Sequence, residues 1–202
     1  MKLSNHWPYA AVSLTAAFFS LLWLAQALWI PAKAELAQLL IERSWRQMVA
    51  GQVNARPWPW ADTQPLGILS VPGHGIRQMI LQGNSGRNLA FGPVLLDGSG
   101  QGADRVISGH RDTHFRFLQH LQPGDRLQIQ LRNEVLTYEV SQLQIVDSSR
   151  NDLVIEPGTP RLSLVTCYPF DTLLAGGPLR YVVTALPVET KLRRPQYSPS
   201  SG

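Results

Sequence analysis

The chain has 202 residues, of which 44% are hydrophobic and 16% are charged, so it is long enough for one domain with an additional segment and too apolar to be disordered. Its net charge of +4 comes from 18 basic and 14 acidic residues, and the basic ones are dispersed, so no nucleic-acid partner is expected. The single cysteine, Cys167, excludes an intrachain disulfide, a Cys-cluster zinc site and a Cys-held iron–sulfur centre. Three roles remain for Cys167: a buried apolar side chain, half of an intermolecular disulfide, or a reactive thiol.

The N-terminal segment has no charged residue between Lys2 and Lys33. A helix of about 21 apolar residues spans roughly 30 Å, the thickness of the hydrocarbon core of a bilayer. Residues 1–33 are therefore predicted to be a signal-anchor transmembrane segment. Ala32-Lys33-Ala34 is similar to a signal-peptidase site, so a cleaved signal peptide is the alternative. Under both interpretations, the rest of the chain is expected to be exported across the membrane. Because exported cysteines usually pair, the unpaired Cys167 is favoured as a reactive thiol.

Residues 34–64 are predicted to form a helical stalk followed by a connector rich in Pro and Trp. Apolar residues recur at near-helical spacing up to Ala50, and Gly51 is a plausible helix stop. The segment Arg56-Pro57-Trp58-Pro59-Trp60 predicts an extended, polyproline-like connector. Its two tryptophans are expected to pack on the following domain, with contact to lipid headgroups as the alternative.

Residues 65–188 are predicted to be an all-β domain, because short apolar runs alternate with Gly, Pro, Asp and Asn. Short helices are expected near 88–91 and 115–121, and residues 189–202 are predicted to be a disordered tail. The number of short strands favours a barrel or sandwich. The expected strands cover Leu66–Val71, Ile76–Leu81, Arg105–Ser108, Arg126–Arg132, Val135–Ser141, Gln144–Val146, Arg161–Cys167 and Leu179–Ala185.

Three segments contain the residue types that thiol chemistry requires. Cys167 ends a predicted strand, and a nucleophilic thiol needs a proton partner, for which His110 in a small-residue loop is the best placed histidine. His110 and His114 could hold a metal only if both were helical, which Gly109 disfavours. Arg180 begins a strand next to a Gly-rich turn, where a cation can stabilise an oxyanion.

Together, GHRDTHF at 109–115, LVTCYPF at 164–170 and GGPLRYVV at 176–183, in this order after a signal-anchor, resemble the sortase family of membrane-anchored cysteine transpeptidases. The sequences of these motifs are most similar to those of the single-chain sortases of Gram-negative marine bacteria. The resemblance implies a closed eight-stranded β-barrel with short helices, held by the N-terminal helix in the bacterial inner membrane with the catalytic domain on the periplasmic side.

For the site, the resemblance implies Cys167 as the nucleophile, His110 as general acid and base, and Arg180 as the oxyanion-binding residue. Thr166 is expected to contact substrate or support the site. Asp112 is expected to pair with a nearby Arg or cap the helix at Thr113, and His114 to support the loop. No metal or other cofactor is expected, since calcium dependence occurs only in some members.

The substrate implied by the resemblance is a protein with a C-terminal sorting motif of the LPXTG kind, which is transferred to an amine acceptor through a thioester acyl-enzyme. Two alternatives remain at this point. The first is a thiol endopeptidase that uses water as the acceptor. The second is a membrane-tethered binding or assembly module in which Cys167 is inert.

Overall fold

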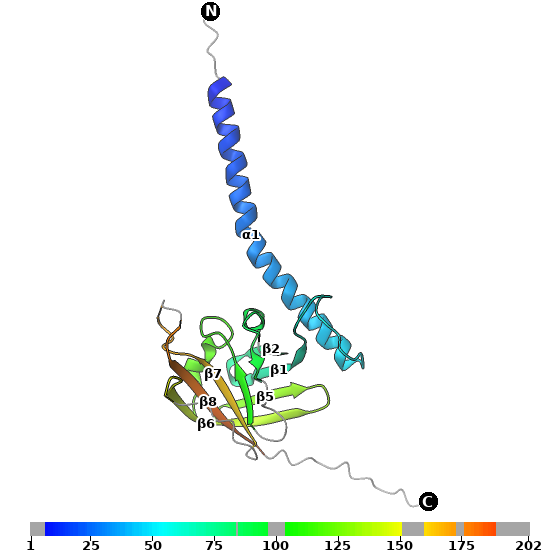
Figure 1. Ribbon diagram of the computed structural model, residues 1–202, viewed down its shortest axis with the longest axis vertical. Helices are drawn as coiled ribbons and strands as arrows, with labels where there is room; N and C mark the ends of the chain where they lie inside the picture. Colours follow the sequence, from blue (N-terminus) through cyan, green and yellow to red (C-terminus); the bar gives the residue numbers. More distant parts are fainter. Residues whose placement is uncertain (1–6, 84, 97–103, 151–159, 173–175, 189–202) are drawn as a thin grey trace, which may run out of the picture. The chain divides into compact units, whose positions relative to one another are not determined.

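The computed structural model describes residues 7–83, 85–96, 104–150, 160–172 and 176–188, and the chain divides into two compact units, 1–40 and 41–202. Helix α1 (Trp7–Val49) runs through the first unit and into the second (Figure 1). From Val12 onward it is long and apolar enough, by length and composition, to cross a membrane. The predicted anchor and stalk thus form one continuous helix. It ends two residues before Gly51, the predicted stop, whose φ of 105° suits glycine.

The second unit is a closed β-barrel, as predicted, with the strand order β1-β2-β3-β4-β7-β8-β6-β5. Short 3₁₀ helices lie within the two regions predicted to be helical, η2 (Asn88–Ala90) and η3 (Arg116–His120), and a third, η1 (Pro72–His74), joins the first two strands. The strands are β1 (Pro65–Val71), β2 (Ile76–Gln82), β3 (Val94–Leu95), β4 (Asp104–Ser108), β5 (Arg126–Leu131), β6 (Val135–Asp147), β7 (Arg161–Cys167) and β8 (Leu179–Pro187).

Two details of the strand prediction were wrong, although the total of eight was right. The segments predicted at Val135–Ser141 and Gln144–Val146 belong to one strand, β6, which stays paired with β8 across an irregularity between Val140 and Gln142. A bulge of this kind interrupts the alternation of side chains without ending the strand. Strand β3 was not predicted, because its two residues are too few for a periodic pattern.

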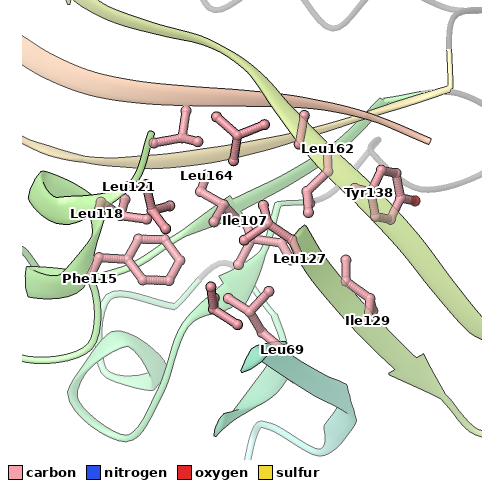
Figure 2. Packing of buried hydrophobic residues seen from close by; sticks show 14 of the residues in the cluster. Leu69, Ile107, Phe115, Leu118, Leu121, Leu127, Ile129, Tyr138, Leu162 and Leu164 are labelled. Carbon is pink, nitrogen blue, oxygen red and sulfur yellow. The ribbon is translucent and has the colours of Figure 1, made fainter. Parts of the chain in front are cut away.

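The barrel interior is filled by aliphatic and aromatic side chains from most strands and from the segment around η3 (Figure 2). In β5, Leu127 and Ile129 point into this core, while Arg126 and Gln130 are exposed, which is the alternation expected of a strand with one buried face. Phe115 and Leu118 close the core from the side of η3. The core therefore fixes the position of the loop between β4 and η3, which contains His110.

The end of α1 and the following connector cover an apolar patch of the barrel around β1, β2 and β3. Ile41 and Trp45 are buried against Ile68, Met79, Leu81 and Val94. Ser44 donates a hydrogen bond to the Ala55 carbonyl at 2.6 Å, which closes the connector back onto the helix. Residues 41–64, expected to be stalk and connector, therefore belong to the compact unit of the barrel.

The connector is not extended as predicted. The Ala61 amide donates to the Trp58 carbonyl at 3.0 Å, which folds the Pro-Trp segment into a turn. Trp58 packs edge-to-face on Phe91 with ring centroids 5.3 Å apart, whereas Trp60 is 83% exposed. The prediction that the tryptophans pack on the domain is therefore correct for Trp58 and wrong for Trp60.

Trp45→Ala should lower the free energy of unfolding by about 3–5 kcal/mol, the usual cost of deleting a buried aromatic side chain. Trp45 is 4% exposed and is central to the covering of the β1–β3 patch. Urea unfolding of the detergent-solubilised chain would measure the change. Trp60→Ala is the matched control and should stay within about 0.5 kcal/mol of wild type, because its ring is exposed. Equal effects of the two substitutions would contradict this packing.

Candidate active site

The strand pairing brings His110, Cys167 and Arg180 into one row across three neighbouring strands. β4 and β7 are parallel, with Ser108 opposite Val165, and His110 follows two residues after the end of β4, at the end of the sheet where Cys167 ends β7. β7 and β8 are antiparallel, and Cys167 is directly opposite Arg180. Adjacent strands lie about 4.8 Å apart, so three polar groups from distant parts of the chain meet at one end of the sheet.

The loop that contains His110 is held by hydrogen bonds on both sides of this residue. The Gly109 amide donates to the Val165 carbonyl at 3.1 Å, and the Thr166 hydroxyl donates to the Gly109 carbonyl at 2.7 Å. The Phe115 amide donates to the His110 carbonyl at 2.9 Å. The main chain of His110 is therefore fixed, while its side chain is exposed and available to a ligand.

Gly109 is required by close packing rather than by an unusual backbone angle. A Cβ atom at this position would lie 2.8 Å from Cγ of Phe115, whose ring is fully buried in the core. Contacts this short do not occur between real side chains, so any larger residue would displace the ring or the loop. The small residue before His110 thus lets the loop pass directly over the barrel core.

Arg180 is oriented by main-chain carbonyls of its own turn. Its Nη1 donates to the Gly177 carbonyl at 2.7 Å and to the Leu179 carbonyl at 2.9 Å. Within the described part of the chain, both hydrogen bonds of this guanidinium use Nη1, which leaves Nε and Nη2 to bind another acceptor. Arg180 starts its strand beside a Gly-rich turn, as predicted.

A small apolar cluster lies next to Cys167 and Arg180 on the same face of the strands. Side chains two residues apart in a strand share a face, so Val165 lies on the side of Cys167 and Val182 on the side of Arg180. Val106 joins them in a small buried cluster against which Leu96 and Val146 pack. The strands that contain Cys167 and Arg180 are therefore packed on this face as well as on the side of the barrel core.

The supporting residues predicted from sequence occupy structural positions around this row. Thr166 is 2% exposed and its hydroxyl is used by Gly109, so it supports the His110 loop. Asp112 pairs with Arg111 at 2.9 Å, one of its two predicted roles, and this hydrogen bond holds the pKa of Asp112 below its ordinary value.

His114 fixes the same loop through its main chain and its ring. Its carbonyl accepts a hydrogen bond from Gln78 Nε2 at 2.6 Å, and its ring bonds the backbone of Ala90. Burial lowers the pKa of His114, which favours the neutral imidazole at neutral pH. Within the described residues, no three His, Cys, Asp or Glu side chains are grouped so that they could hold a metal ion.

In comparison with known proteins, residues 69–188 match the family model of the Sortase domain. The chain belongs to the sortase family. It is 33% identical over 127 residues to sortase D of Bacillus subtilis (strain 168), a match that covers 59% of this chain and 62% of that protein. The alignment therefore spans less than two thirds of this relative.

Solved structures of other sortases share the fold. Sortase C-1 of Actinomyces oris superimposes with a TM-score of 0.54 and 26% identity, covering 63% of this chain and 76% of that one. Clostridium perfringens sortase C with the C-terminal cell wall sorting motif superimposes with a TM-score of 0.54 and 20% identity, covering 79% and 91%. The second likeness concerns the fold alone.

Two features of this sortase site were not found from the sequence. Arg111, next to His110, is 7% exposed and bonded to the segment after Cys167, yet nothing distinguished it among 15 arginines. Tyr168, Phe170 and Tyr181 form an aromatic cluster beside Cys167 and Arg180, with ring centroids 5.2–6.2 Å apart. The residues of this cluster are adjacent to the motifs, but only the β7–β8 pairing brings Tyr181 to the other two rings.

Proposed function

We propose that this chain is a membrane-anchored cysteine transpeptidase. It cleaves a C-terminal sorting motif of a substrate protein and transfers the new C-terminus to an amine. The observation that carries the proposal is the row of His110, Cys167 and Arg180 on three adjacent strand ends. A thiol, an imidazole and a guanidinium are the nucleophile, proton carrier and anion-binding group that acyl transfer needs.

In the first half of the reaction, the Cys167 thiol gives its proton to His110, and the thiolate Sγ attacks the carbonyl carbon of the scissile peptide bond. The carbonyl oxygen becomes an oxyanion, which Arg180 stabilises through its unused N–H groups. The carbon–nitrogen bond then breaks, and His110 donates a proton to the leaving amine. A thioester between the substrate acyl group and Cys167 remains.

In the second half, the acceptor amine attacks the thioester carbonyl and gives its proton to His110. The carbon–sulfur bond breaks, a new amide forms and Cys167 is released. His110 thus acts first as acid and then as base, and the protons balance over the cycle without a cofactor. The exposed position of the His110 side chain supports this role, because both amines approach from solvent.

The proposed location is the bacterial inner membrane, with a single span and the catalytic unit on the periplasmic side. Helix α1, whose apolar side chains from Val12 to Trp29 are exposed, supports the anchoring. Lys33 lies 5.2 Å above the Trp29 ring, a pairing suited to the interface between membrane and water. The similarity to the sortases of Gram-negative marine bacteria stays a prediction.

Transfer and hydrolysis are distinguished by incubating the enzyme with an LPXTG-type peptide, with and without a primary amine such as hydroxylamine or triglycine. We expect the amine to produce a transfer product at the expense of hydrolysis, because both acceptors compete for one thioester. Mass spectrometry would quantify both products. Cleavage without a transfer product at any amine concentration would instead support the thiol endopeptidase.

A further inference from the structure

Arg111 connects the loop that contains His110 to the segment that follows Cys167. Its Nη1 donates to the Pro169 carbonyl at 2.7 Å, and its Nη2 donates to the Thr172 carbonyl at 3.0 Å. Its Nε donates to Asp112 at 2.9 Å. One planar group therefore joins the residue next to His110 to the segment that begins two residues after Cys167, about 60 positions further along the chain.

The two carbonyls that Arg111 binds lie on either side of Phe170. The Phe170 ring packs edge-to-face on Tyr181 with centroids 5.2 Å apart, and Tyr181 follows Arg180 in β8. Arg111 thereby holds the segment after Cys167 against the third strand of the site. The loop that contains His110 and the strand ends that contain Cys167 and Arg180 are in this way all linked to the Arg111 side chain.

Burial makes this connection rigid. Arg111 is almost entirely buried, and a buried guanidinium is tolerated only when its donors are bonded. The hydrogen bond with Asp112, above all, raises the pKa of Arg111, and the neighbouring Cys167 and Asp171 contribute in the same direction. Arg111 is therefore always charged and always needs these carbonyl partners.

We propose that Arg111 is a positioning residue that fixes His110 at reaction distance from Cys167. The inference rests on the proposed function, and it assigns to Arg111 no contact with substrate. Arg111 acts on the rate through the position of His110. This effect can be large, because misplacement of a catalytic group by about 1 Å can cost about 100-fold in rate. A lysine at this position keeps the charge but cannot bind two carbonyls and a carboxylate in one plane.

The test is a double-mutant cycle on the alkylation of Cys167 by iodoacetamide. Because the chain has one cysteine, adduct formation reports that residue alone, and no substrate is needed. His110→Ala should slow alkylation at pH 7 about 10-fold in the wild-type background, since the imidazole assists formation of the thiolate. In the Arg111→Lys background the same substitution should change the rate less than about 3-fold.

Turnover of the peptide substrate gives the second readout. Arg111→Lys should lower kcat about 10- to 100-fold and change KM less than about 3-fold, because binding surfaces are unaffected. Arg105→Lys is the matched control: Arg105 is half-buried and its guanidinium donates to Tyr138 at 3.1 Å, but it lies near the opposite end of β4. It should change kcat less than about 3-fold.

An equal effect of His110→Ala on alkylation in both backgrounds would overturn the inference, as would an unchanged kcat in Arg111→Lys. If Arg111→Lys does not fold, as judged by thermal unfolding, Arg111→Gln is measured in the same cycle with the same expectation. Failure of the proposed function is recognised separately. In that case wild type turns over no peptide while the alkylation cycle still shows coupling between Arg111 and His110.

Discussion

Cys167→Ala should abolish both cleavage and transfer, with a loss of at least about 10⁴-fold in kcat/KM, the scale seen when a covalent nucleophile is removed. No other thiol is present in the chain to replace it. The acyl-enzyme should be visible by mass spectrometry in wild type as an adduct on Cys167 that hydroxylamine releases, and absent from the variant. The barrel should remain folded, because Cys167 is only half-buried and ends its strand.

Ser70→Ala is a suitable control for this experiment. Ser70 is half-buried in β1, which is not a neighbour of β4, β7 or β8, and it makes no hydrogen bond through its side chain within the described residues. It should retain activity within about 3-fold of wild type. If Cys167→Ala left the biological function intact and Cys167 of wild type resisted thiol-reactive probes, the membrane-tethered binding module with an inert cysteine would be the correct interpretation.

Arg180→Ala should lower kcat about 10²- to 10³-fold, comparable to removal of one oxyanion-binding donor in other acyl-transfer enzymes. Arg180→Lys should be nearly as harmful. A lysine ammonium could replace the hydrogen bonds to the Gly177 and Leu179 carbonyls, but it would not present the remaining planar N–H groups to the oxyanion. Single-turnover acylation with the peptide substrate measures this step directly.

The control for Arg180 is Arg126→Ala. Arg126 is exposed at the start of β5, opposite Glu139, and is not part of the catalytic row. Its removal changes the net charge of the protein by the same amount and should leave acylation within about 2-fold of wild type. Near-wild-type acylation by Arg180→Lys would refute the assigned role of the guanidinium.

Elements with a strong local pattern were predicted well from the sequence. The strand β5, the strand that ends at Cys167 and the strand that begins at Leu179 all appear within two residues of the predicted bounds. Strand β3 and the continuity of β6 were not predictable in this way. The first has only two residues, and the second depends on a bulge that is stabilised by its partner strand.

For the site, the sequence identified residue types but not their contacts. Thr166 was considered as a substrate contact, whereas its buried hydroxyl supports Gly109. Arg111 was not identified, because its importance comes from two carbonyls near the end of another strand. The calls that fall on residues 1–6 and 189–202 lie outside the described residues.

By itself, the sequence determined what depends on neighbouring residues: an apolar N-terminal helix, a β domain of short strands, and one thiol at a strand end. The resemblance of three ordered motifs added the candidate partners of that thiol. Only the tertiary structure decided that His110, Cys167 and Arg180 form one row, that residues 41–64 cover the barrel, and that Arg111 links the two reacting loops. The physical reason is that strand register and the satisfaction of buried polar groups are long-range properties, which arise when distant segments pair and exclude water.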